Sequence, residues 1–112
     1  MVLGVSEVNL LELTGAYAAF ANGGFKVTPR LITSVSDAEG QVLEYTTLER
    51  DPVLKPADAF LMTSMLASVI KEGTARSLSA LGWTRSSAGK TGTTNDGRDA
   101  WFVGYTRELL AG

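Results

Sequence analysis

The chain has 112 residues, so it is long enough for one small globular domain. Its contents of 45% hydrophobic and 20% charged residues are ordinary for a globular fold. Its net charge of −2 gives no basic stripe for binding nucleic acid. It contains no cysteine and no histidine, which excludes disulfides, thiol nucleophiles, histidine-ligated metals and Ser-His-Asp catalysis for these residues, and we expect no metal and no cofactor. No apolar run approaches the ~18 residues of a transmembrane helix, and the first residues lack the regions of a signal peptide.

The first predicted element is a helix that begins after Ser6, a favourable N-cap residue. The segment Asn22-Gly23-Gly24 tolerates positive φ and predicts the end of this helix. Between these limits, apolar residues recur at the spacing of one helical face, namely Leu10, Leu13, Tyr17 and Phe20. The sequence therefore predicts a helix with one buried stripe.

The next segment predicts a surface β-ribbon. Two short extended runs lie around Pro29, a turn-like segment follows, and a third extended run returns. In chain order these are residues 25–27, 31–35, 37–40 and 42–45. The turn-like segment has the sequence Asp-Ala-Glu-Gly, which is typical of a solvated turn.

A second helix is predicted to begin at Pro56, a residue that suits the first helical turn, and to end at Lys71-Glu72-Gly73. We expect its apolar residues to form one face, comprising Phe60, Met62, Met65, Leu66, Val69 and Ile70. Residues 75–81 predict one or two further helical turns. The connector before this helix, residues 49–52, is polar.

The last part of the chain predicts a β-hairpin. Residues 86–94 and 99–106 are strand-like and are joined by a polar turn, and residues 109–112 resemble the start of a third strand. We expect Trp101 and Tyr105 to pack in a core rather than to stack on sugar. The order helix, ribbon, helix and sheet predicts an α+β fold.

The most informative residues are Lys90, Thr91, Gly92 and Thr93, which contain a Lys-Thr-Gly triplet on the first hairpin strand. If this strand lines a cleft, Lys90 supplies a cation that attracts a carboxylate or tunes a hydroxyl, and the two threonines supply hydroxyls that donate or accept. Gly92 would let a ligand backbone approach closely, and an edge strand can bind a peptide as an added strand. These features suit a peptide substrate that ends in a carboxylate.

The triplet also has two other interpretations. The simplest is a glycine-rich strand or turn without a ligand, because short motifs occur by chance. The other is a nucleotide-binding loop, since Gly89-Lys90-Thr91 matches the end of G-x-x-x-x-G-K-[ST]. That loop needs its first glycine at position 84, which is Thr84, and Gly82 is two residues too far away, so the loop is disfavoured.

Two further matches resemble serine-enzyme motifs. Ser87-Ala88-Gly89-Lys90 spells S-x-x-K, a nucleophile motif that functions at a helix start, where residues three apart share a face. On a strand the same spacing puts Ser87 and Lys90 on opposite faces, so we do not expect Ser87 to be a nucleophile. Thr93-Thr94-Asn95 resembles a relaxed S-x-N motif, but it overlaps the Lys-Thr-Gly strand and cannot also face it.

With these motifs the chain resembles the transpeptidase domain of class A penicillin-binding proteins, which are peptidoglycan synthases, and the resemblance covers nearly all of it. Lys-Thr-Gly is one of the three motifs of the serine β-lactamases and penicillin-binding proteins. Residues 3–24 resemble the family's helix after the S-x-N region, and residues 62–74 resemble the helix and glycine loop before the sheet. The most specific part is residues 88–94 with 99–106.

The resemblance implies a serine β-lactamase/transpeptidase-like fold and an acyl-serine reaction on D-Ala-D-Ala stem peptides, which β-lactams block. It implies that Lys90 and Thr93 are catalytic and that Lys90, Thr91, Gly92 and Thr93 bind substrate. Lys90 would shape the electrostatics of the cleft, and the two threonines would bind the terminal carboxylate. The backbone N–H of Thr93 would be one oxyanion donor.

The chain also departs from the family, because it has no credible S-x-x-K and no separate S-x-N, and Gly73-Thr74-Ala75 replaces the usual Gly-Thr-Gly. We therefore expect residues 1–112 to be a partial domain, the C-terminal Lys-Thr-Gly half, with the nucleophile half upstream and the parent a D,D-transpeptidase. The resemblance implies that the parent lies on the extracytoplasmic face of the cytoplasmic membrane. Whether the chain alone is an enzyme stays open, and the alternative is a non-catalytic peptide-binding or interaction module.

A partial domain would leave apolar side chains without partners. We expect such exposure at Trp101, Phe102, Met62 or Met65, and therefore marginal stability for the isolated chain.

Overall fold

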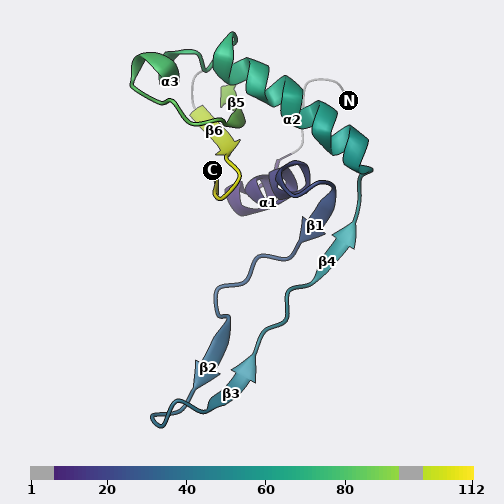
Figure 1. Ribbon diagram of the computed structural model, residues 1–112, viewed down its shortest axis with the longest axis vertical. Coiled ribbons are helices and arrows are strands. Elements are labelled where there is room, and N and C mark those ends of the chain that lie inside the picture. Colours follow the sequence, from purple (N-terminus) through teal and green to yellow (C-terminus); the bar gives the residue numbers. More distant parts are fainter. Residues whose placement is uncertain (1–6, 94–99) are drawn as a thin grey trace.

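The computed structural model describes residues 7–93 and 100–112 of the chain. Figure 1 shows a body formed by α1, α2, α3 and the β5–β6 pair, and a ribbon of β1 to β4 that extends away from it; the molecule measures 52 × 35 × 33 Å. The helices are α1 (Leu10–Ala21), α2 (Pro56–Lys71) and α3 (Ser77–Ala80). The strands are β1 (Phe25–Val27), β2 (Ser34–Ser36), β3 (Val42–Tyr45), β4 (Arg50–Pro52), β5 (Ala88–Thr93), β6 (Ala100–Tyr105) and β7 (Leu110–Ala111).

Helix α1 begins later than expected, at Leu10, and its N-cap is Asn9. The Asn9 side chain accepts a hydrogen bond from the Glu12 backbone N–H at 2.8 Å, and the Glu12 carboxylate accepts one from the Asn9 N–H at 3.1 Å. This reciprocal capping box needs Glu or Gln three residues after the cap. The expected cap, Ser6, has Asn9 at that position and lies outside the described residues; the expectation is wrong, because it is Asn9 that has a Glu three residues later.

The end of α1 and the ribbon are confirmed, but the connector predicted at residues 49–52 is wrong in part, because residues 50–52 form strand β4 and belong to the ribbon. The chain leaves the helix through Gly23 and Gly24, whose φ values of 82° and 113° disfavour other residues. Strand β1 then pairs with β4, and β2 pairs with β3, both antiparallel. At the far end of the ribbon the Asp37 carboxylate accepts hydrogen bonds from the backbone N–H groups of Glu39 and Gln41, which fixes the turn.

Helix α2 begins at Pro56 and ends at Lys71, as predicted. Its apolar residues do not form a single face, however, because Phe60 and Met65 are 71% and 65% exposed. The buried residues are Ala59, Leu66 and Ile70. Their spacing of seven and four places them on one side of the helix, toward β5 and α1, and leaves Phe60 and Met65 on other sides.

The sheet has the strand order β5-β6-β7 with antiparallel pairing, which confirms the hairpin, the third strand and the α+β class. Helix α2 packs along β5, while α1 contacts β6 and β7. Tyr105 is buried as expected, and Trp101 is half-buried. The exposure expected for unpartnered residues is found at Met65 and at Phe102, which is 39% exposed, whereas Met62 is half-buried.

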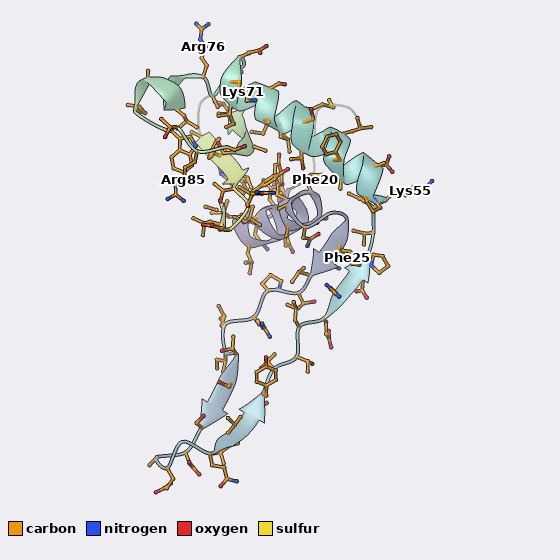
Figure 2. All side chains as sticks on the ribbon, in the orientation of Figure 1. Phe20, Phe25, Lys55, Lys71, Arg76 and Arg85 are labelled. Carbon is orange, nitrogen blue, oxygen red and sulfur yellow. The ribbon has the colours of Figure 1, made fainter. Side chains whose placement is uncertain are left out.

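Three elements meet at the Thr63 hydroxyl. It donates to the backbone carbonyl of Phe20 at 3.3 Å and lies 2.9 Å from the Tyr105 hydroxyl. Since a hydroxyl has one proton, Tyr105 is the donor in the second bond. Beside this junction lies a core cluster of Leu66, Ala88 and Tyr105, against which Phe20 packs, and Figure 2 shows Phe20 between α1 and α2.

The exposed apolar side of α2 predicts that the isolated chain binds ANS, aggregates, and melts without a cooperative transition. Phe60→Lys removes part of this apolar surface, so it should lower ANS fluorescence and light scattering. Ser64→Lys is the matched control, because it adds the same charge at an exposed α2 position and removes no apolar area. A cooperative thermal transition of the monomeric chain would contradict this expectation.

The junction also predicts a high pKa for Tyr105. Burial is the largest cause and raises the pKa of its hydroxyl above the ordinary value of 10.0, and Tyr17 adds a smaller rise. The folded protein thus holds this proton more tightly, and the stabilisation is complete below about pH 10 and is lost as the pH rises through the folded-state pKa. The absorbance difference at 295 nm between the full-length protein and its Tyr105→Phe variant should show an inflection above pH 10; an inflection below that value would refute the assignment.

Candidate active site

Strand β5, which carries the Lys-Thr-Gly triplet, lies at an edge of its sheet. It pairs with β6 along its whole length, and within residues 7–93 and 100–112 no other strand pairs with it. An edge strand presents backbone N–H and C=O groups to whatever lies beside it. The triplet therefore sits where an extended peptide could be added to the sheet, as the sequence indicated.

The four candidate residues divide between the two faces of the sheet. Cross-strand partners share a face, so the register assigns each residue. Lys90 and Gly92 lie opposite Val103 and Trp101, on the face that carries Ala88 of the core cluster, and Thr91 and Thr93 lie opposite Phe102 and Ala100 on the other face. The two threonines are thus brought to one face, as binding of a single carboxylate requires, while Lys90 must act from the other side of the strand.

The Lys90 ammonium is exposed. Its Nζ donates a hydrogen bond to the backbone carbonyl of Thr91 at 2.7 Å. Among the described side chains the one ion pair joins Arg85 and Glu108, at 3.9 Å, so Lys90 has no carboxylate partner there. A cation held only by its own strand is available to an anionic ligand.

Thr91 has a partner that sequence reasoning did not place in the site. Its Oγ1 lies 3.0 Å from Oγ1 of Thr74, in the turn between α2 and α3. Thr91 is half-buried, whereas Thr74 and Thr93 are exposed. The only sequence signal for Thr74 was the departure of Gly73-Thr74-Ala75 from Gly-Thr-Gly, which gave no indication of a hydroxyl contact.

Gly89 and Gly92 of β5 differ in whether the described structure leaves room for a side chain. A Cβ on Gly89 would lie 2.8 Å from the Val103 carbonyl oxygen and 2.9 Å from the Gly104 Cα, so the close approach of two backbones requires glycine. A Cβ on Gly92 would meet nothing nearer than the Trp101 Cβ, at 4.0 Å. The described residues therefore do not sterically require glycine at position 92.

Ser87 does not have the environment of a nucleophile. Its Oγ accepts a hydrogen bond from the Trp83 indole N–H at 2.9 Å and donates to the Arg85 carbonyl at 3.3 Å. It directly precedes β5, so no helix begins there, as the S-x-x-K motif would require. Gly89-Lys90-Thr91 lies within a strand, which excludes the nucleotide-binding loop. Thr94 and Asn95 of the S-x-N-like match lie outside the described residues.

Two cavities lie elsewhere. One, of about 150 Å³, lies beside Trp83 and Leu109, and the other, of about 630 Å³, lies between α1 and the base of the ribbon. Both are lined mainly by apolar side chains, and neither is lined by Lys90, Thr91, Gly92 or Thr93.

The family model described as the penicillin-binding protein transpeptidase domain matches residues 3–108. The chain belongs to the penicillin-binding protein transpeptidase family. Penicillin-binding protein 1A of Aquifex aeolicus is 44% identical over the whole chain, and that of Neisseria lactamica is 41% identical over 98% of it, which puts the chain in class A.

Solved structures of the family share the fold. Penicillin-binding protein 1A from Haemophilus influenzae matches 87% of the chain and 20% of its own, with a TM-score of 0.79 and 27% identity. The D,D-transpeptidase domain of a peptidoglycan glycosyltransferase from Eggerthella lenta matches 87% of the chain and 24% of its own, with a TM-score of 0.75 and 30% identity. The chain spans 14% and 15% of the length of the Neisseria lactamica and Aquifex aeolicus relatives. None of the described helices has the length and apolarity to span a bilayer.

The two glycines predict opposite effects on stability. In the full-length protein that carries these residues, Gly89→Ala should lower the melting temperature strongly or prevent folding, because its Cβ would overlap backbone atoms of β6. Gly92→Ala should change the free energy of unfolding by less than about 0.5 kcal/mol, as surface substitutions usually do. Differential scanning calorimetry of both variants measures this, and equal destabilisation by the two would show that Gly92 also serves the fold.

Proposed function

We propose that these residues form the Lys-Thr-Gly wall of a serine-type D,D-transpeptidase site that cross-links peptidoglycan stem peptides. The observation that carries this proposal is an exposed edge strand on which the Lys90 cation has no carboxylate partner among the described side chains, two threonines share one face, and the described residues do not require glycine at position 92. Membership of the transpeptidase family supports it. The ligand would be a peptide that ends in D-Ala-D-Ala, or a β-lactam.

In this reaction a serine oxygen adds to the carbonyl carbon between the two D-alanines. The carbon–nitrogen bond breaks, the terminal D-Ala leaves with a proton on its nitrogen, and an amine of a neighbouring strand then displaces the serine. A β-lactam acylates the same serine as its ring amide opens. The hydroxyls of Thr91 and Thr93 bind the ligand carboxylate, the Thr93 N–H stabilises the oxyanion, and Lys90 supplies positive charge.

The nucleophile comes from a part of the domain other than these 112 residues. Ser87 makes hydrogen bonds with the Trp83 indole and the Arg85 carbonyl, and no helix begins at it. The chain is accordingly one part of the domain, with the serine facing β5 across a cleft. For a protein that cross-links peptidoglycan, the working place is the extracytoplasmic face of the cytoplasmic membrane.

A second function, a non-catalytic peptide-binding or interaction module, fits one observation. The edge of β5 can add a peptide strand by its backbone groups alone, without any nucleophile. The two functions differ in one property, since only the enzyme forms a covalent bond with penicillin.

Fluorescent penicillin distinguishes these functions in the full-length protein. We expect it to be labelled at a serine outside these residues, and we expect Lys90→Met to lower the second-order rate constant of acylation about 10- to 100-fold, the worth of a charged hydrogen bond. Lys55→Met is the matched control, because Lys55 makes no side-chain cap hydrogen bond and Figure 2 shows it at the N-terminal end of α2, so it should change the rate less than twofold.

Failure of the full-length protein to be labelled would favour the non-catalytic module. Labelling of the 112-residue chain by itself would instead make Ser87 a nucleophile and would overturn the strand assignment. Mass spectrometry of the labelled peptide identifies the serine in either case.

A further inference from the structure

The turn between α2 and α3 holds Thr74 in a fixed backbone position. Before it, the Gly73 N–H is shared between the carbonyls of Ser68 and Val69, both at 3.2 Å, and a Cβ at Gly73 would lie 2.8 Å from the Val69 Cα. After it, the Ala75 N–H donates to the Val69 carbonyl at 3.2 Å, and Ala75 is only 4% exposed. Both neighbours of Thr74 are therefore anchored on the last turn of α2.

This anchoring places the Thr74 hydroxyl beside the Lys-Thr-Gly strand. The two Oγ1 atoms of Thr74 and Thr91 are 3.0 Å apart, although the residues are 17 positions apart in sequence. Each hydroxyl has one proton to donate and can accept two hydrogen bonds. If Thr91 donated to Thr74, it would have no proton left for an anionic ligand.

A carboxylate beside Thr91 removes this ambiguity. A carboxylate only accepts hydrogen bonds, so Thr91 must donate to it, and the remaining bond then requires Thr74 to be the donor. Hydroxyls in a chain polarise one another, which strengthens the terminal bond. Thr74 is exposed, so water can donate hydrogen bonds to its own lone pairs.

We propose that Thr74 is a positioning residue, which donates its hydroxyl proton to Thr91 and thereby directs the Thr91 proton toward the ligand carboxylate. Thr74 does not touch the ligand in this arrangement; it acts through Thr91. The inference rests on the proposed function and adds to it a residue outside the Lys-Thr-Gly strand that sets the preference for a carboxylate-bearing ligand.

The test compares two ligands in the full-length protein, benzylpenicillin with its free carboxylate and the methyl ester of benzylpenicillin. In Thr74→Val the second-order acylation rate with the free acid should fall about three- to tenfold, the worth of one hydrogen bond, while the rate with the ester stays within about twofold of wild type. Thr74→Ser keeps the hydroxyl and should restore the preference. In a Thr91→Val background, Thr74→Val should have no further effect, because the residue through which it acts is gone.

Thr106→Val is the matched control. It is the same chemical change, and it also removes a hydroxyl that makes hydrogen bonds, because the Thr106 side-chain oxygen accepts from the backbone N–H groups of Glu108 and Leu109 after the end of β6. It should lower the melting temperature and leave the ratio of acid to ester rates unchanged. The inference is overturned if Thr74→Val slows both ligands equally or neither, or if Thr74→Ser behaves like Thr74→Val. An unlabelled wild-type protein overturns the proposed function itself, and the inference with it.

Discussion

The hydroxyl of Thr63 is the point on which the body of this structure depends. It is one group with one proton, yet it joins the C-terminal part of α1, the middle of α2 and the end of β6. Because these bonds are directional, they fix the axial position of α2 against the sheet, which packing of Leu66 on Ala88 alone would leave free to slide. Tyr105 must stay protonated to complete the junction, and burial favours that state.

The position of α2 in turn determines where Thr74 lies relative to the candidate site. Between Thr63 and the turn at Gly73 there are less than three turns of helix, so an error in the axial position of α2 would be passed directly to Thr74. The Thr74–Thr91 contact lies just after the end of that helix, and the helix packs against β5. The core junction and the surface hydroxyl pair are thus two fixed points of one rigid element, and a polar contact in the core sets the geometry of a polar contact at the strand.

Sequence reasoning found the elements whose signals are local. The Asn-Gly-Gly end of α1, the start of α2 at Pro56 and the alternation along β6 each follow from backbone rules at the residue itself. It failed where burial depends on tertiary structure. Phe60 is as apolar as Leu66, and the positions of β5 and α1 determine that Leu66 is the buried residue. Likewise, nothing local could show that Thr74 and Thr91 touch, because their contact depends on how α2 crosses the sheet.

The first residues of β5 are explained by contacts within the fold, whereas the later residues of the same strand are not. Ala88 and Gly89 are buried, and each is small because the core cluster or the β6 backbone leaves no room. From Lys90 onward the same strand is largely exposed, and its residue types no longer follow from internal contacts. An exposed lysine is common on an edge strand, but a glycine without a steric reason among the described residues is an unfavourable choice for a strand. Under the proposed function, this glycine gives room for a molecule that binds along the edge.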